Sequence, residues 1–387
     1  MNRINMEQKG KKRFGKIFQK GGIMETSSNI EKVDHPGKYL NEILEEKNMT
    51  QKELSVRTGV SEKHISTIIK GTKNISASFA RRLEYALPKP MSYWMLLQTE
   101  YDNYILQREE KEGISFEEQK VLSVLKDIVK FLQEKGMIEN VTDKTDIILA
   151  LRKFMGVSRL TAIPEIKYNA AYRAQVSNNV NVDPYILYAW KRICERYVSD
   201  INISGNVNND ELRKRISDIK NLMFLGINQI ETELTRILAD CGIAFKIVPH
   251  FRGAPVQGFI SKNSNDKMML CLTLRQGRAD KFWFTLFHEI GHILNGDGDL
   301  NFVDFDSVKS EAEEQADLFA KNALLDSNAY RKFWAKGDFS LPVIKKFAEE
   351  QHVKPYIVIG RLQKENELEW SEYSKEMVYY KWASSEM

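Results

Sequence analysis

Cysteine is rare in this sequence: only three of its 387 residues are cysteines, and they lie far apart. Cys194, Cys241 and Cys271 lack the C-x-x-C spacing of paired cysteines, so their positions do not indicate a disulfide framework. Thiols without such pairing are typical of proteins in a reducing compartment. We therefore expect three free thiols and a cytoplasmic protein.

Long apolar runs are absent as well. No segment approaches the ~20 consecutive apolar residues that a membrane-spanning helix requires. The first residues also lack the apolar core of a signal peptide. These absences argue against a membrane protein, and the length of 387 residues is sufficient for two or three domains.

The small excess of positive charge, +4 over the whole chain, comes from the N-terminus. Residues 1–34 hold eight Lys and Arg against four Asp and Glu, and the remaining residues balance at 49 against 49. We expect residues 1–34 to form a basic, disordered leader, for which one interpretation is a nucleic-acid-binding arm. A simpler interpretation starts from Lys20–Met24, because a purine-rich ribosome-binding site ahead of a start codon would be translated into this sequence. It predicts Met24 as the natural start and residues 1–23 as an upstream extension.

The sequence H-E-I-G-H at residues 288–292 is the most informative stretch of the chain. Residues four apart share one face of a helix, so both histidines can point at one metal ion. Zinc lowers the pKa of a bound water to roughly 7, and the carboxylate of Glu289 can take the proton of that water. Apolar residues at 282–287 and 293–294 predict a buried helix, in which such polar side chains need partners. The alternative is a hydrogen-bonded histidine pair in the core.

A third ligand is expected from a second helix, over residues 307–325, which is rich in acidic residues. We assign Glu313 as this ligand, with Glu314 or Glu311 as the alternatives. Asp317 lies one turn after Glu313 on the same face and can orient a ligand histidine by a hydrogen bond. Without the upstream motif, a solvated acidic helix face would be the better interpretation of this cluster.

Two segments, Phe282–His292 and Glu313–Ala320, resemble the ImmA/IrrE family of metallo-endopeptidases. The resemblance implies one zinc ion per chain, with His288, His292 and Glu313 as its ligands and Glu289 as the catalytic base. One departure concerns the end of the second helix, where the family often has a proline and this chain reads Leu324-Leu325-Asp326. This difference affects how the helix ends and leaves the zinc chemistry unchanged.

A run of short amphipathic helices is predicted near the N-terminus. Thr50 to Glu53 has the pattern of a capping box that starts one helix, and Gly59 is suited to the turn that ends it. Ser61 caps the next helix, which gives the helix-turn-helix arrangement. Polar and basic side chains gather on its exposed face, where they suit bases and phosphates. The expected DNA contacts are Gln51, Ser61, Lys63, His64, Ser66, Thr67 and Lys70.

Charge supports this interpretation, since residues 36–98 hold ten Lys and Arg against six Asp and Glu. Residues 50–54 and 59–61 resemble the hallmark positions of the XRE/HigA type of helix-turn-helix, and Ile357–Gln363 extends a likeness to HigA-type regulators fused to ImmA/IrrE domains. The resemblance implies operator double-stranded DNA as a partner, and a homodimer would read two half-sites about 34 Å apart. The alternative is a helical bundle used only for dimerisation or for holding the protease shut.

The predicted fold class is mainly α with a small β-sheet (α+β). Short β-type runs at 244–248, 256–261 and 268–274 precede the helix of the H-E-I-G-H motif. The expected divisions are a leader (1–34), a five-helix helix-turn-helix domain (35–104), a helical middle region (105–240), a zincin-like metallopeptidase domain (241–370) and a C-terminal tail (371–387).

Two functions remain open at this point. In the first, the chain is a zinc endopeptidase that cleaves a repressor, an antitoxin or itself, and so switches gene expression. In the second, it is a HigA-like antitoxin or repressor whose zinc site is structural or sensory. The presence of Glu289 favours the first function, because a structural site needs the ligands alone. The helix-turn-helix pattern favours the second.

Overall fold

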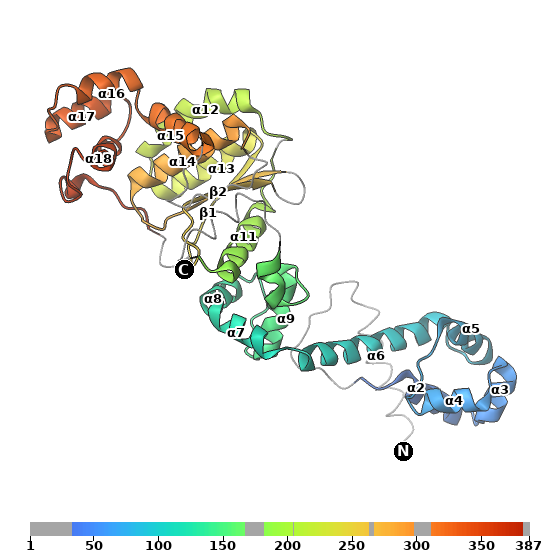
Figure 1. Cartoon of the computed structure of the whole chain (residues 1–387). Helices are drawn as coiled ribbons and strands as arrows, with labels where there is room; N and C mark the ends of the chain where they lie inside the picture. The colour runs from blue at the N-terminus through green and yellow to red at the C-terminus, as the bar shows by residue number, and fades with distance from the viewer. Residues whose placement is uncertain (1–32, 167–181, 204, 263–266, 298–310, 382–387) are drawn as a thin grey trace, which may run out of the picture. The chain divides into compact units, whose positions relative to one another are not determined.

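The computed structural model describes residues 33–166, 182–203, 205–262, 267–297 and 311–381. The expected leader therefore lies almost wholly outside the described residues. The chain forms two compact units (Figure 1), residues 33–115 with 141–146 and residues 116–140 with 147–381. Its mainly α character with a small β-sheet confirms the predicted fold class.

Five helices form the described part of the first unit, as predicted: α2 (Pro36–Glu46), α3 (Gln51–Thr58), α4 (Glu62–Ile69), α5 (Ala77–Ala86) and α6 (Met91–Glu112). Thr50 caps α3 by accepting a hydrogen bond from the backbone N–H of Glu53, at 3.1 Å. Gly59 ends α3 in the left-handed conformation, with φ of 66°. Glu53 does not complete the expected capping box, because its carboxylate pairs with Arg57 instead.

The core of this unit is apolar and fully enclosed. Ile65 and Ile68 of α4 are completely buried and pack with Leu40 of α2 and Leu54 of α3. Gly37 lies so close to the end of α4 that any Cβ atom there would overlap the carbonyl oxygen of Ile68. The glycine therefore permits α2 to cross α4, which fixes the orientation of the second helix of the helix-turn-helix.

The second unit contains most of the helices and the sheet. Its helices are α7 (Phe116–Val124), α8 (Lys126–Glu134), α9 (Lys144–Met155, which begins in the first unit), η1 (Leu160–Glu165), α11 (Pro184–Val198), α12 (Asn209–Asn221), η2 (Leu222–Phe224), α13 (Ile227–Asp240), α14 (Ala279–Asn295), α15 (Glu311–Leu324), α16 (Ser327–Trp334), α17 (Leu341–Glu350), α18 (Pro355–Lys364) and η4 (Ser374–Glu376).

The sequence of Ser115 to Glu118 has the pattern of a capping box and predicts one helix over 115–136. This prediction is wrong, because the chain forms α7 and α8 with a break at Leu125. Glu118 of α7 is buried and does not act in an N-terminal capping box. Its carboxylate accepts hydrogen bonds from the guanidinium of Arg152, at 3.0 and 2.5 Å, and from the backbone N–H of Leu160, at 2.8 Å. A buried carboxylate needs such partners, so Glu118 joins α7 to α9 and η1.

The sheet has three strands, β1 (Ile243–Val248), β2 (Gly258–Lys262) and β3 (Met268–Thr273), in the order β1-β3-β2. β3 pairs in parallel with β1 and antiparallel with β2. Side chains alternate between two faces along a strand, and both faces are covered. Ile243, Phe245 and Ile247 pack with α13 and α14, whereas Ala244 and Val248 pack with α11.

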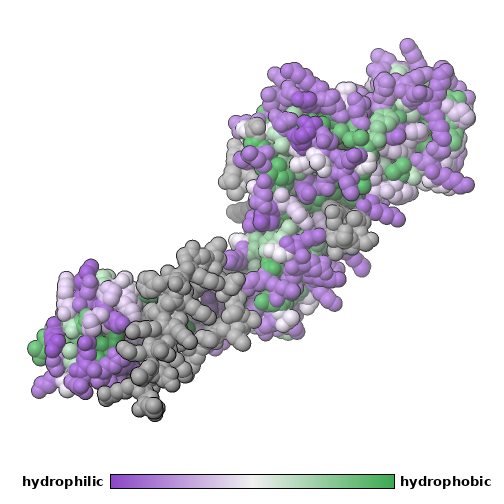
Figure 2. All heavy atoms as spheres, turned by 180° about the vertical axis from the view of Figure 1, so that it is seen from behind, coloured by the Kyte–Doolittle hydropathy of each residue, from purple (hydrophilic) through white to green (hydrophobic). Residues whose placement is uncertain are grey.

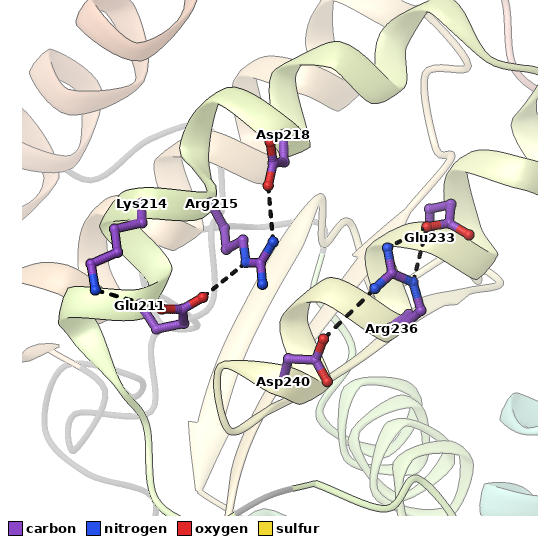
Figure 3. A network of polar contacts seen from close by, with 7 residues as sticks. All are labelled: Glu211, Lys214, Arg215, Asp218, Glu233, Arg236 and Asp240. Carbon is purple, nitrogen blue, oxygen red and sulfur yellow. Dashed lines mark hydrogen bonds and ion pairs between the residues drawn. The ribbon is translucent and has the colours of Figure 1, made fainter.

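The surface of the described residues is mainly polar. Hydrophilic residues cover most of the face drawn in Figure 2, with hydrophobic residues in smaller patches between them. On α12 and α13 the exposed charges form ion pairs within each helix (Figure 3), such as Arg215 with Glu211 at 2.9 Å and Arg236 with Glu233 at 2.7 Å. Exposed pairs of this kind contribute little to stability. Among the described residues, no helix combines the length and apolar character that a membrane crossing requires.

All three cysteines are buried and free of disulfides, as the sequence predicts. Cys194 of α11 and Cys271 of β3 belong to the same core beneath the sheet. Burial raises the pKa of the Cys194 thiol, and contact with Cys271 raises it further. Both side chains therefore act as small apolar groups of the core.

Candidate functional site

Two helices bring together three side chains that carry metal-binding atoms. α14 supplies His288 and His292, one turn apart, and α15 supplies Glu313 from its first turn. The Nε2 atoms of the two imidazoles lie 3.0 Å apart. Oε2 of Glu313 lies 3.0 Å from Nε2 of His288 and 3.6 Å from Nε2 of His292. Within the described part of the chain, this is the one group of potential ligands that lies within 4.8 Å.

The spacing of these atoms matches the requirements of zinc. Zinc bonds of about 2.0–2.1 Å at tetrahedral angles separate two ligand atoms by about 3.3 Å. The separations of 3.0, 3.0 and 3.6 Å agree with one face of such a tetrahedron. Two imidazole nitrogens and one carboxylate oxygen are also a donor set that zinc prefers, with a fourth position left open. The three residues therefore fit a zinc ion.

A carboxylate lies behind each histidine. Nδ1 of His288 is 2.9 Å from Oδ1 of Asp317, and Nδ1 of His292 is 3.0 Å from Oδ2 of Asp297. When a metal is bound and the rings are neutral, these carboxylates would accept a hydrogen bond from Nδ1–H and leave Nε2 for the metal. The lone pair of Nε2 then faces the other ligands, which is the arrangement that outer carboxylates give to metal-binding histidines.

The electrostatics of the group favour a cation. Burial raises the pKa of the Glu313 carboxyl, but hydrogen bonds from His288 and His292 outweigh it and lower the pKa to about 2. Burial lowers the pKa of His292, but the hydrogen bond to Glu313 and the charge of Glu289 outweigh it, so the net pKa is raised. The group thus attracts a proton in the absence of metal, and a metal ion competes for the same position.

Glu289 lies fully buried beside the histidines, and its carboxylate abuts the start of β2. A Cβ atom at Gly258 would overlap Oε1 of Glu289 and lie 2.8 Å from Cδ and Cγ. Only glycine therefore leaves room for the carboxylate in this orientation. Gly258 was not among the predicted site residues, and its only signal in the sequence is a glycine near the start of a predicted strand.

A second close approach sets the distance between the two helices. A Cβ atom at Gly291 would lie 3.1 Å from Cα of Ala316 and 3.2 Å from the ring of Phe319. Ala316 is itself completely buried. The contact of these two small residues allows α15 to approach α14, and it places Glu313 over the histidines.

The structure brings together most of the residues that the sequence predicted for this centre. His288, His292, Glu313 and Asp317 lie in direct contact, and Glu289 is adjacent. Glu311 and Glu314, the alternatives for the third ligand, are exposed and lie outside the group. Asp297 was missed, because its loop position carries no periodic signal.

The residues expected to contact DNA lie on or next to α4, which follows the turn at Gly59, except for Gln51, which begins α3. Ser61, Lys63 and Lys70 are exposed, whereas Gln51, His64, Ser66 and Thr67 are half-buried. Two of these side chains already have local roles. Ser61 accepts from the backbone N–H of His64, at 3.3 Å, and Thr67 donates to the carbonyl of His64, at 2.7 Å. The two exposed lysines therefore lie at opposite ends of α4, Lys63 in its first turn and Lys70 at its C-cap.

Arg82 was not among the predicted site residues, yet it holds the turn of the helix-turn-helix. Its guanidinium donates to the carbonyl of Thr58, at 3.0 Å, and to that of Gly59, at 3.3 Å. A cation at the end of a helix also interacts well with the helix dipole. Arg82 thus ties α5 to the end of α3.

Comparison with known proteins identifies the first unit. Residues 40–94 match the Helix-turn-helix family, so this part of the chain is a helix-turn-helix domain. No curated protein matches the chain.

Solved structures that match cover about one fifth of the chain. One is the Pseudomonas aeruginosa antitoxin HigA with the higBA promoter (28% identity, 21% of this chain, 89% of that chain, TM-score 0.20). Another is a Pseudomonas aeruginosa protein in complex with its operator DNA (30% identity, 19% of this chain, 82% of that chain, TM-score 0.19). A third is an addiction module antidote protein of a HigA family from Coxiella burnetii (21% identity, 22% of this chain, 98% of that chain, TM-score 0.20).

Proposed function

We propose that the chain is a zinc-dependent endopeptidase joined to a DNA-binding helix-turn-helix domain. The observation that carries the proposal is the group of His288, His292 and Glu313, with Glu289 buried beside it. A structural zinc site has four protein ligands, whereas this group offers three and leaves a position open. The adjacent carboxylate is the residue that hydrolysis needs and that a structural site does not.

The proposed roles follow from the contacts of each side chain. His288, His292 and Glu313 would hold the zinc ion, and Asp317 and Asp297 would orient the two imidazoles. Zinc, when bound, supplies a Lewis acid that polarises a peptide carbonyl and lowers the pKa of water. Glu289 would accept the proton of the attacking water and pass it to the leaving amine.

The helix-turn-helix domain supports the second half of the proposal. α4 would lie in the major groove, with Lys63 and Lys70 on phosphates and the shorter polar side chains of its exposed face near the bases. The family match over residues 40–94 supports this role. The domain would bring the peptidase to an operator.

The resemblance to ImmA/IrrE peptidases suggests the class of substrate. It implies a regulatory protein, such as a repressor or an antitoxin, or the chain itself. Cleavage would then relieve repression in a stress, mobile-element or toxin–antitoxin circuit.

Metal analysis of the full-length protein, together with a peptide-hydrolysis assay, tests the proposal. We expect one zinc ion per chain, loss of that ion in the variant Glu313→Ala, and hydrolysis of a quenched peptide library that a chelator abolishes and zinc restores. The matched control is Glu314→Ala, since Glu314 is exposed on the same turn and outside the group. Equal zinc content in the two variants would contradict the assignment.

A second function is a transcriptional repressor or antitoxin whose metal site is structural or sensory. The match of residues 40–94 to the Helix-turn-helix family favours it. It predicts zinc binding and DNA binding without hydrolysis of any peptide or of the chain itself.

A further inference from the structure

A pocket lies in the second unit, beside the candidate metal centre and along α14. Lys281 and Thr285 of α14 line it, together with Gln257, Thr273, Arg275 and Arg278 from the strands and the following turn. Residues four apart share a helix face, so Lys281, Thr285 and Glu289 follow one another along α14. The pocket therefore lies along the first turns of α14 and ends at Thr285, one turn before Glu289.

The far wall of the pocket is fixed by the ends of β2 and β3. Gln257 directly precedes Gly258, the residue against which the Glu289 carboxylate packs. The backbone N–H of Thr273 donates to the carbonyl of Gln257, at 2.8 Å, and its hydroxyl donates to the carbonyl of Val256, at 2.7 Å. The same segment thus borders the pocket at Gln257 and the carboxylate at Gly258.

The charged side chains that line the pocket are all positive. Arg275, Arg278 and Lys281 line it, and no carboxylate is among the described residues that do so. Arg278 is balanced by its neighbour Asp280, at 2.9 Å. Arg275 donates to the carbonyl of Pro255, at 2.8 Å, which holds its guanidinium at the rim. The N-terminus of α14, at Ala279, adds a positive helix dipole to these cations.

We propose that this pocket binds an acidic side chain of the peptide substrate, and the proposal rests on the peptidase function above. Positions 285 and 281 precede Glu289 by about 6 and 12 Å of helix. An extended peptide advances about 3.3 Å per residue. An Asp or Glu two to four residues from the cleaved bond would therefore place its carboxylate between Arg275 and Lys281, with Thr285 and Gln257 as further hydrogen-bond partners.

Peptide binding to the full-length, zinc-loaded Glu289→Gln variant tests the pocket without any need for cleavage. The probe is a labelled, end-capped hexapeptide with four Glu residues, compared with the same peptide carrying Gln, by fluorescence anisotropy. We expect the Glu peptide to bind at least about tenfold more tightly at low salt, since charge-assisted contacts to a carboxylate are strong. The added double substitution Arg275→Gln and Lys281→Gln should reduce its affinity to that of the Gln peptide.

The control is the double substitution Lys332→Gln and Lys336→Gln, at exposed positions in and just after α16. It removes the same charge and should leave binding of the Glu peptide unchanged. Zinc content and circular dichroism establish that each variant is folded. Equal binding of the Glu and Gln peptides, or equal loss in the two double variants, would overturn the pocket.

Hydrolysis by the zinc-loaded wild type separates this proposal from the peptidase function. Cleavage concentrated two to four residues from an acidic position supports both. Binding of the Glu peptide through Arg275 and Lys281 without cleavage of any peptide supports the pocket and contradicts the peptidase. Cleavage that is indifferent to acidic residues supports the peptidase and contradicts the pocket.

Discussion

At the scale of single residues, the missing side chain of Gly258 matters as much as the carboxylate that packs against it. Any Cβ atom there would overlap Oε1 of Glu289, and Glu289 is fully buried, so it has little room to move. The glycine therefore leaves the space that the carboxylate occupies.

We predict that Gly258→Ala lowers peptide hydrolysis by about 10²–10⁴-fold, the usual contribution of a general base, while zinc affinity stays near that of the wild type. Kinetics and a zinc titration of the same preparation check this. Gly226→Ala is the control, because Gly226 has φ of −73° and its nearest neighbour would lie 3.9 Å away. Equal activity of Gly258→Ala and wild type would show that Glu289 does not depend on this contact.

The pKa values of His292 and Glu313 also predict how the stabilisation by zinc depends on pH. In the metal-free protein, the raised pKa of His292 stabilises the folded state. This contribution is complete below pH 6.5 and is lost as the pH rises through the raised pKa. The lowered pKa of Glu313 contributes stability above 4.5 that is lost as pH falls toward about 2. Zinc needs neutral imidazoles, so its stabilisation grows with pH.

We therefore predict that the Tm difference between zinc-saturated and metal-free protein increases between about pH 6 and pH 8. Thermal unfolding with and without zinc across this range measures it. A difference that stays constant or shrinks as pH rises would argue against histidine ligation.

Residues with metal-binding or acidic side chains were easier to predict than the small residues that leave room for those side chains. His288 and His292 could be identified because residues four apart share one face of a helix. Glu289 belongs to the same short motif, and Glu313 was predicted from the acidic segment that follows it. Gly258 lies about thirty positions before Glu289 in the sequence, and its role arises only from packing. The hydrogen bond of Asp297 to His292 likewise depends on the path of a loop.

At the scale of elements, the contact between α14 and α15 determines the geometry of the centre. Gly291 and Ala316 meet where the helices approach each other, Gly291 directly before His292 and Ala316 three residues after Glu313. A methyl group at Gly291 would press on Cα of Ala316 at 3.1 Å, and backbone yields less readily than a side chain.

We predict that Gly291→Ala weakens zinc binding by roughly tenfold or more, since overpacking typically costs about 1–3 kcal/mol. Unfolding in denaturant should show a smaller loss for the metal-free protein than for the zinc-loaded one. A zinc titration checks the affinity, and an unchanged dissociation constant would show that α15 does not need this close approach.

The sequence predicted where several helices start and end, but it did not predict which elements pack or pair with each other over long distances in the chain. Thr50, Ser61 and Gly59 occupy the caps that their side chains or conformations favour. The break at Leu125 and the contacts of Glu118 with Arg152 and Leu160 were not predicted, because such contacts join residues far apart in the sequence. The strand order β1-β3-β2 was also beyond reach, since short apolar runs specify a strand without specifying its neighbour.

At the scale of the whole molecule, the chain combines a helix-turn-helix domain with a second unit that holds the candidate metal centre. DNA binding by the first unit depends on cations that lie against phosphates. Removing one such cation should make the slope of log K against log salt shallower by about 0.9, because one counterion fewer is released on binding.

We predict that Lys63→Ala makes this slope shallower by about 0.9, the contribution of one phosphate contact, on a duplex of arbitrary sequence. Titrations at several salt concentrations measure the slope. Lys332→Ala, at an exposed lysine of α16, should leave it unchanged. Identical slopes for wild type and Lys63→Ala would place the DNA on another surface of the domain.

The most direct test of the peptidase is the variant Glu289→Gln, compared with wild type for zinc content and for hydrolysis of the same quenched peptide library. The two side chains have nearly the same shape, so the contact with Gly258 is kept and only the proton acceptor is removed. We predict one zinc ion per chain in both proteins, and hydrolysis by wild type that falls by about 10²–10⁴-fold in the variant. Zinc-loaded wild type that cleaves no peptide, or equal cleavage by both proteins, would contradict a catalytic role for this centre.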